Sequence, residues 1–324
     1  MKKYLPAALI ATVTILLSAA CTGAAQPSAH SQTHTPAAIN APAAIAASPA
    51  APAGPPAHPK FESTGLNAGW TDPETGFNIS NDMWNCPQAA CGRQEVWANS
   101  SGDWGVVSTM AKGNTAVLVY PAVQQQFGAN QPALLGNASE LVSTFTEAMP
   151  TTAGTIGEAA YDIWLNDWNT EVMIWVDNQH QTFYQPLLGT ATFGGQQFRI
   201  YMDHGVSHGY PSGPFFFVLQ HNETHGTIDI LAVFHWLERA GYLSAAKDTL
   251  TAVDFGWEIC STNGVPENFH ISHYTLTAKG IQLSAVSRPA RNDRRIQRGQ
   301  SRRNRRPTRA FTRIGYRSVV GILR

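Results

Sequence analysis

The sequence has little charge and few cysteines for its length. Only 14% of the 324 residues are charged, and four are cysteine. No CxxC pair is present, so a zinc site of that kind is not expected. The apolar run near the start is shorter than the roughly 20 residues of a membrane-spanning helix. No internal repeat of solenoid length is evident.

Residues 1–21 have the pattern of a secretory signal, because two lysines precede an apolar run that ends in small residues. Ser18–Cys21 resembles a bacterial lipoprotein cleavage site, although Leu17 lies four rather than three residues before the cysteine. Lipidation of Cys21, which would attach the protein to the outer face of the cell membrane, and ordinary cleavage near Ala25 both stay open. We expect a secreted, extracellular protein.

The rest of the chain divides into three zones by composition. Residues 22–60 are rich in Ala and Pro with almost no charge, which predicts a linker. Residues 61–286 hold nearly all of the β pattern and are long enough to bury a core as one domain. Residues 287–324 contain thirteen arginines, no lysine and one acid.

The net charge of zero conceals this asymmetry. Outside the tail there are 22 − 13 = 9 Lys plus Arg and 22 − 1 = 21 Asp plus Glu, a net charge of −12. An arginine run can bind nucleic acid or anionic surfaces. An exported protein rarely meets nucleic acid, however, so we expect a disordered tail or the product of a shifted reading frame, and no nucleic-acid partner.

The cysteines of the body suggest one crosslink. Cys86 and Cys91 lie close together in a loop that contains a proline. Outside the cytoplasm they are expected to form a disulfide. Cys260 is expected to be an unpaired thiol.

Short β-rich runs recur between Gly, Asn, Asp and Pro, which indicates a sandwich, barrel or jelly roll. Residues 227–243 differ, because their apolar residues follow the period of a helix that ends near Gly241. We expect an all-β fold with one helix packed outside. The predicted strands include residues 95–100, 104–110, 115–121, 159–166, 171–176, 181–188, 197–202, 214–220 and 273–278.

One of these strands carries a carboxylate on an otherwise apolar face. In TEVMIWVDN, Glu171, Met173 and Trp175 share one face, and the other face is aliphatic. The preceding run forms a predicted hairpin with it, so Asp162 is expected near Glu171 or Met173. Together with Trp164, these side chains suit the floor of a carbohydrate cleft, where indoles stack on sugars and carboxylates perform chemistry.

A second acid has similar surroundings in DFGWEICSTNG. Glu258 alternates with large apolar residues, and the small Gly256 and Cys260 are expected to leave space beside its carboxyl group. Two such strands placed side by side would oppose Glu171 and Glu258 across a groove.

Two other motifs have a less specific meaning. Residues 205–209 match G-x-S-x-G, but a nucleophile elbow needs a following helix, and Tyr210–Pro214 cannot start one. A loop at the rim of the cleft is expected instead. The pairs His204/His208 and His221/His225 have the i, i+4 spacing of metal ligands on a helix, but they lie in loop or strand sequence and are expected at the surface or the rim.

Four stretches together resemble glycoside hydrolase family 12. They are NDMW at 81–84, VLVYP at 117–121, AYDIW with EVMIW, and FGWEI at 255–259. The resemblance implies a β-jelly roll of two packed antiparallel sheets with a concave cleft. It also implies an endo-acting enzyme on β-glucans that needs no metal or organic cofactor.

The resemblance implies roles for individual residues. Glu171 would be the nucleophile, Glu258 the general acid/base, and Asp162 would hydrogen-bond the nucleophile and keep it ionised. Trp84 would form a sugar-stacking platform, and Met173 would pack beside the reacting centre. The expected substrate-binding set is Asn81, Trp84, Trp164, Met173 and Trp175.

The predicted chemistry is retaining hydrolysis of β-1,4-glucan chains, with cellulose, mixed-linkage β-glucan or xyloglucan as substrate. Such enzymes place two carboxyl groups about 5–5.5 Å apart, one charged and one protonated. An aromatic, partly dry setting would raise the pKa of Glu258. The alternative is a non-catalytic β-glucan-binding jelly-roll module, because a fold alone does not determine function. We expect a monomer.

Overall fold

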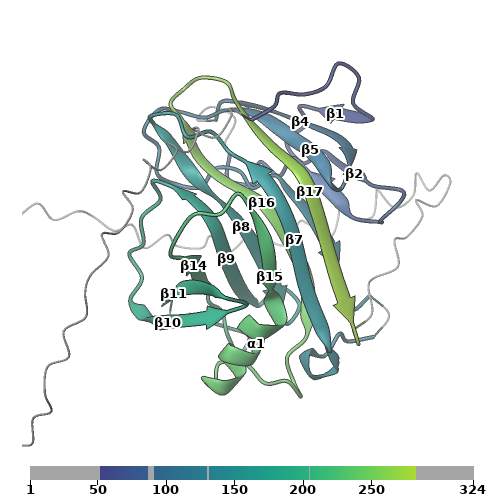
Figure 1. Cartoon of the computed structure of the whole chain (residues 1–324), viewed down its shortest axis with the longest axis vertical. Helices are drawn as coiled ribbons and strands as arrows, with labels where there is room; N and C mark the ends of the chain where they lie inside the picture. Colours follow the sequence, from purple (N-terminus) through teal and green to yellow (C-terminus); the bar gives the residue numbers. More distant parts are fainter. Residues whose placement is uncertain (1–51, 87–90, 130, 204, 282–324) are drawn as a thin grey trace, which may run out of the picture. The chain divides into compact units, whose positions relative to one another are not determined.

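The computed structural model describes residues 52–86, 91–129, 131–203 and 205–281 (Figure 1). The predicted signal segment, most of the predicted linker, residues 282–286 of the predicted body and the arginine-rich tail lie outside these ranges. Within them, no helix is both long enough and apolar enough to cross a bilayer.

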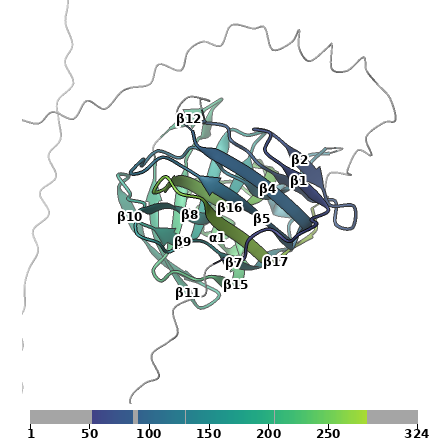
Figure 2. The ribbon, with the colours of Figure 1, turned by 90° about the horizontal axis from the view of Figure 1, so that it is seen from above.

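One layer of the fold is a six-stranded sheet whose neighbouring strands are all antiparallel. Figure 2 shows several of its strands side by side. In spatial order the strands are β1 (Phe61–Ser63), β4 (Arg93–Ser100), β5 (Asp103–Thr109), β17 (Glu267–Lys279), β7 (Glu140–Ala148) and β15 (His225–Asp229).

The other layer is a nine-stranded sheet, and the two layers form the predicted all-β jelly roll. One pairing departs from the expected antiparallel pattern, since β14 and β9 run parallel. In spatial order the strands are β10 (Leu187–Phe193), β11 (Gln196–Met202), β14 (Phe215–Leu219), β9 (Thr170–Gln179), β8 (Thr155–Leu165), β16 (Leu250–Thr262), β6 (Ala122–Gln126), β3 (Asn78–Ser80) and β2 (Gly69–Thr71).

Aromatic side chains fill the space between the two sheets. The rings of Trp104 on β5 and Trp257 on β16 are 5.1 Å apart, and those of Phe145 on β7 and Phe255 on β16 are 5.2 Å apart. Because side chains alternate along β16, burying Phe255 and Trp257 in this core turns Glu258 to the opposite face. The core therefore determines which face of the larger sheet carries the acids.

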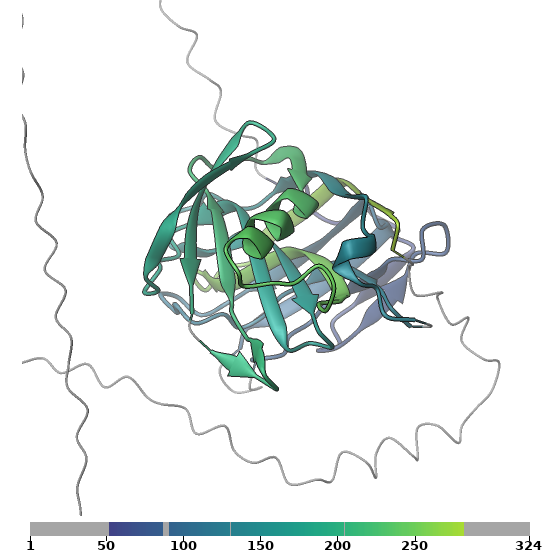
Figure 3. The same ribbon diagram turned by 90° about the horizontal axis from the view of Figure 1, so that it is seen from below.

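The single α-helix of the described ranges, α1 (Ile230–Arg239), packs against β7 (Figure 3). It begins three residues later than predicted, because Thr227 and Ile228 belong to β15 and Asp229 caps the helix by accepting a 3.0 Å hydrogen bond from Ala232 N. The helix buries Ile230, Val233, Phe234 and Leu237.

Two predicted strands are wrong in part. Residues 115–121 form only an isolated bridge, between Val119 and Ile259. Gln181–Pro186 is irregular, and β10 begins only at Leu187. The first segment instead contacts β16 through the Val119 bridge, and the second contacts β9 through the ring of Phe183.

Gly256 allows one of these segments to approach β16 closely. A Cβ atom added to Gly256 would lie 1.9 Å from Pro121 O and 2.8 Å from Ala122 Cα. Trp257 N donates to the same Pro121 O at 3.3 Å. The expected free space at Gly256 is therefore occupied by the backbone that leads into β6.

We expect Gly256→Ala to lower the free energy of unfolding by about 3 kcal/mol, because the added methyl group overlaps a fixed backbone. Urea denaturation would measure this loss. Gly189→Ala in β10 is the matched control, since a Cβ there meets nothing within 4 Å. Equal stability of the two variants would contradict this account of Gly256.

Candidate active site

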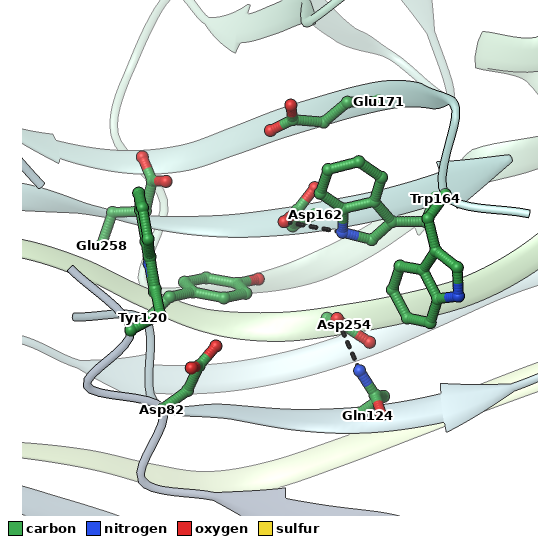
Figure 4. A pocket seen from close by; sticks show the side chains of 10 residues that line it. Asp82, Tyr120, Gln124, Asp162, Trp164, Glu171, Asp254 and Glu258 are labelled. Atoms are coloured by element: carbon green, nitrogen blue, oxygen red, sulfur yellow. Dashed lines mark hydrogen bonds between the residues drawn. The ribbon is translucent and has the colours of Figure 1, made fainter. Parts of the chain in front are cut away.

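A cleft of about 420 Å³ lies on the face of the nine-stranded sheet that carries the acids (Figure 4). Its side chains come mainly from β6, β8, β9 and β16 and from the loops beside them. The lining consists of Asp82, Trp84, Tyr120, Gln124, Asp162, Trp164, Trp168, Glu171, Asp254 and Glu258.

Strand register brings the three predicted catalytic residues to this cleft. Strand β8 lies between β9 and β16, so Glu171 and Glu258 stand on strands that are not direct neighbours. On β8, Asp162 is opposite Met173 of β9, as predicted, and opposite Asp254 of β16. In Figure 4, Glu171, Asp162 and Glu258 all project into the cleft.

The two glutamates share a low-dielectric environment. Burial raises the pKa of Glu171 to about 8, and the charge of Glu258 contributes to the same shift. Burial also raises the pKa of Glu258, and a contact with Glu158 opposes that rise. The cleft therefore holds one negative charge on this pair more easily than two, as a site with one acid and one nucleophile requires.

Asp162 is buried and is hydrogen-bonded to another side chain of the cleft lining. Its Oδ2 accepts a 3.0 Å hydrogen bond from Trp164 Nε1, and its Oδ1 has no hydrogen-bond partner among the described residues. Burial and the charges of Glu171, Asp254 and Glu258 raise its pKa well above the usual range. A neutral Asp162 has a proton to donate from Oδ1, and its hydrogen bond to Glu171 stays a prediction.

Three indoles line the cleft, and two of them are strongly exposed. Trp84 is 60% exposed and Trp168 is 43% exposed. The rings of Trp164 and Trp168 are 5.7 Å apart. Trp84 and Trp164, both predicted to bind substrate, lie in the cleft lining, and their contact with sugar stays a prediction. Trp168 was not predicted to line the cleft, although it lies in the turn of the predicted hairpin that carries Asp162 and Glu171.

The structure does not bring the other three predicted substrate-binding residues to the cleft lining. Asn81 is fully buried, where its Nδ2 donates to Gly65 O at 2.8 Å and its Oδ1 accepts from Gln94 Nε2 at 3.0 Å. These bonds position the chain that leads to Trp84.

Met173 and Trp175 do lie on the face of Glu171, but they are 2% and 5% exposed. The Phe183 ring lies 4.4 Å from the Trp175 ring and covers it. Tyr201 and Phe216 complete this aromatic cluster. The irregular loop at 181–186 thus fills the sheet face where the sequence predicted open floor.

Asp254 was missed, although strand periodicity places it on the face of Glu258, four residues away. Its Oδ2 accepts from Gln124 Nε2 at 3.0 Å, and burial raises its pKa to about 8. Asp82 and Tyr120 were missed too, although both lie inside the quoted family motifs. Burial raises the pKa of Asp82 to about 6.

Asp254 makes the stability of the fold depend on pH. Its pKa is higher folded, about 8, than the ordinary 3.8 of the unfolded chain. The folded state then keeps a proton that the unfolded state loses. The contribution of Asp254 to stability is therefore full below about pH 4 and falls as pH rises toward 8, by about 1.4 kcal/mol per pH unit.

We therefore expect Asp254→Asn to lose less stability than the wild type between about pH 5 and pH 7. The asparagine oxygen can still accept from Gln124 but carries no charge. Urea denaturation at the two pH values tests this, with the exposed Asp203→Asn as the control that should follow the wild type. Parallel pH dependence of all three proteins would contradict it.

The remaining predicted features lie outside the cleft lining. Cys86 and Cys91 form a disulfide, with Cα atoms 5.2 Å apart, and the buried Cys260 is free. Among the described residues no cluster of His, Cys, Asp or Glu could hold a metal ion.

The G-x-S-x-G stretch is not a nucleophile elbow. It folds as a short hairpin of β12 (Val206–Ser207) and β13 (Tyr210–Pro211), so a strand follows where an elbow needs a helix. His208 in its turn is exposed, as predicted, and its Nδ1 lies 2.6 Å from Asn169 Oδ1. His221 and His225 are also exposed, and His204 lies outside the described residues.

The fold has counterparts in solved structures. The xyloglucanase domain of a type three effector from Sinorhizobium fredii has 22% sequence identity and a TM-score of 0.59, over 68% of this chain and 100% of that one. A family 12 xyloglucanase from Bacillus licheniformis has 21% identity and a TM-score of 0.58, over 68% and 100%. The catalytic domain of Humicola grisea Cel12A has 16% identity and a TM-score of 0.59, over 67% and 99%.

These similarities define the class of fold. The chain has the β-jelly-roll fold of the family 12 glycoside hydrolases. No protein-family model matches the sequence, and no curated protein matches it. The likeness is therefore one of architecture, and the activity has to be argued from the cleft itself.

Proposed function

We propose that the protein is an endo-acting retaining glycoside hydrolase that cleaves β-1,4-glucan chains of cellulose, mixed-linkage β-glucan or xyloglucan. The observation that carries this proposal is the meeting of Glu171, Glu258 and Asp162 in one cleft with exposed indoles. Glycoside hydrolysis uses a pair of carboxyl groups, and the indoles would give the sugar rings an apolar surface to pack on.

The proposed reaction has two steps. Glu171 attacks the anomeric carbon while Glu258 gives its proton to the departing glycosidic oxygen, which leaves a glycosyl group on Glu171. Glu258, now a carboxylate, takes a proton from water, and the water releases the sugar. Burial raises the pKa of Glu258, in the direction that an acid needs, but it raises the pKa of Glu171 too. The assignment of the two roles therefore rests on the resemblance of their strands to the family motifs, with Asp162 as the group that would keep Glu171 ionised.

Ligands in similar structures support the substrate class. The effector domain from Sinorhizobium fredii was solved with cellobiose, and the Humicola grisea domain with a thio cellotetraose. Both ligands are short gluco-oligosaccharides. Export of the protein and a monomeric state are further parts of the proposal, and they rest on sequence pattern, which leaves lipidation of Cys21 and ordinary cleavage both open.

The test is a reducing-sugar assay on carboxymethylcellulose, barley β-glucan and xyloglucan. New reducing ends together with a rapid fall in viscosity support endo-hydrolysis. The competing function is a non-catalytic binding module, which would bind these glucans and release no reducing ends. That outcome would overturn the proposal.

A further inference from the structure

A second glutamate lies behind the proposed acid/base. Glu158 on β8 is directly opposite Glu258 in the register of β8 and β16, where paired residues have Cβ atoms about 4.5–5.5 Å apart. Glu158 is fully buried, whereas Glu258 lines the cleft. Neither carboxyl oxygen of Glu158 has a hydrogen-bond partner of good geometry among the described residues.

The surroundings of Glu158 offer no positive charge to compensate an anion. From β16 it faces Glu258 and the buried thiol of Cys260. Gln181 Nε2 donates to Cys260 Sγ at 3.0 Å and also approaches Glu158. Tyr120, Asp162 and Glu171 interact electrostatically with Glu258, and none of them is a cation.

Two buried carboxylates in contact cannot both be ionised at modest cost. A single proton shared by Glu158 and Glu258 removes one of the two charges. It also gives Glu158 a hydrogen-bond partner, in an O–H···O⁻ bond of the strong, charge-assisted kind. The proton belongs on Glu158, the more deeply buried of the two, because a negative charge on Glu258 is better solvated at the cleft. Burial and the charge of Glu258 accordingly raise the pKa of Glu158 well above the usual range.

We propose that Glu158 is a positioning residue for Glu258: it keeps its own proton and donates it in a hydrogen bond to the Glu258 carboxylate. This inference rests on the proposed function. Glu158 and Glu258 together hold two protons before Glu258 protonates the leaving oxygen. They hold one proton while the glycosyl group is on Glu171, and two again after Glu258 has taken a proton from water. Glu158 thus stabilises the charged form in which Glu258 must wait between the two steps.

Two substitutions separate this role from a merely structural one. Glu158→Gln keeps an N–H donor for Glu258 without a titrating group, and Glu158→Leu removes the donor at similar volume. The basic limb of kcat/KM against pH reports the acid of the free enzyme. We expect the limb to move up by at least about one pH unit in Glu158→Leu and to stay within a few tenths in Glu158→Gln. Glu147→Gln is the control matched for burial, and its limb should not move.

Two outcomes would overturn the inference. A basic limb that moves to lower pH in Glu158→Gln would mean that Glu158 is an anion in the wild type. An unchanged limb in Glu158→Leu would mean that Glu158 does not act on Glu258.

A second measurement does not depend on turnover or on the folding of Glu158→Leu. Carboxyl ¹³C NMR of glutamate-labelled protein should show, near neutral pH, a protonated carboxyl signal that disappears in Glu158→Gln. A Glu158 signal that is ionised at that pH overturns the inference. Absence of hydrolysis by the wild type, with this signal present, would count against the proposed function alone.

Discussion

Glu171→Gln is expected to reduce kcat on β-glucan by at least about 10⁴-fold, the largest effect of any single substitution in the cleft. The amide keeps the size of the side chain but cannot attack the anomeric carbon. Binding of cello-oligosaccharides should survive, because the indoles proposed to contact the sugar are unchanged. Initial rates of reducing-end release and calorimetric titration with cellotetraose measure the two quantities.

The matched control for this substitution is Glu62→Gln, which changes an exposed glutamate on β1 of the opposite sheet. It should retain wild-type kcat and stability. Turnover by Glu171→Gln within about tenfold of the wild type would refute the assignment of the nucleophile, provided that its unfolding curve matches that of the wild type.

Glu258→Ala is expected to lower kcat/KM on polysaccharide by about 10²- to 10⁴-fold, because the leaving oxygen no longer receives a proton. A substrate whose leaving group is already acidic, such as a dinitrophenyl cellobioside, should lose much less in its first step. Added azide should then restore turnover and yield a β-glycosyl azide, since the anion can enter the vacated space and attack the glycosyl group on Glu171.

The pattern across substrates is what identifies the role of Glu258. Equal losses on the polysaccharide and on the activated substrate, without an azide product, would show that Glu258 is not the acid/base. Glu258→Gln serves as the companion variant, because it fills the same space and should gain little from azide. NMR of the azide product would also establish whether configuration at the anomeric carbon is retained.

Residue patterns were sufficient to predict the strand of Glu171 and the strand of Glu258. In both, large apolar residues at alternate positions leave the acid on the other face, and the core between the two sheets buries those residues as expected. Asp254 follows the same period, so it was available to the same reasoning and was overlooked.

Contacts between distant segments could not be predicted in this way. Nothing in the local pattern of residues 181–186 indicates that Phe183 covers Trp175, because this contact depends on where the loop leaves β9. The partner of Glu158 likewise follows from the register of β8 and β16, and a shift of one residue would have turned the side chain to the core. Gly256 was interpreted from its size alone, whereas its role comes from a chain segment more than a hundred residues earlier.

The aromatic cover over Trp175 has a consequence for the products. If the proposed activity holds, sugar units that cross β6, β16, β8 and β9 would lie over the open cleft, whereas Phe183 covers Phe216 of the next strand, β14. A long glucan would therefore have to pass over the Phe183 cover on one side of the cleaved bond, and it would lie in the open cleft on the other side. The two fragments should leave with unequal ease, and short oligosaccharides should be split off-centre.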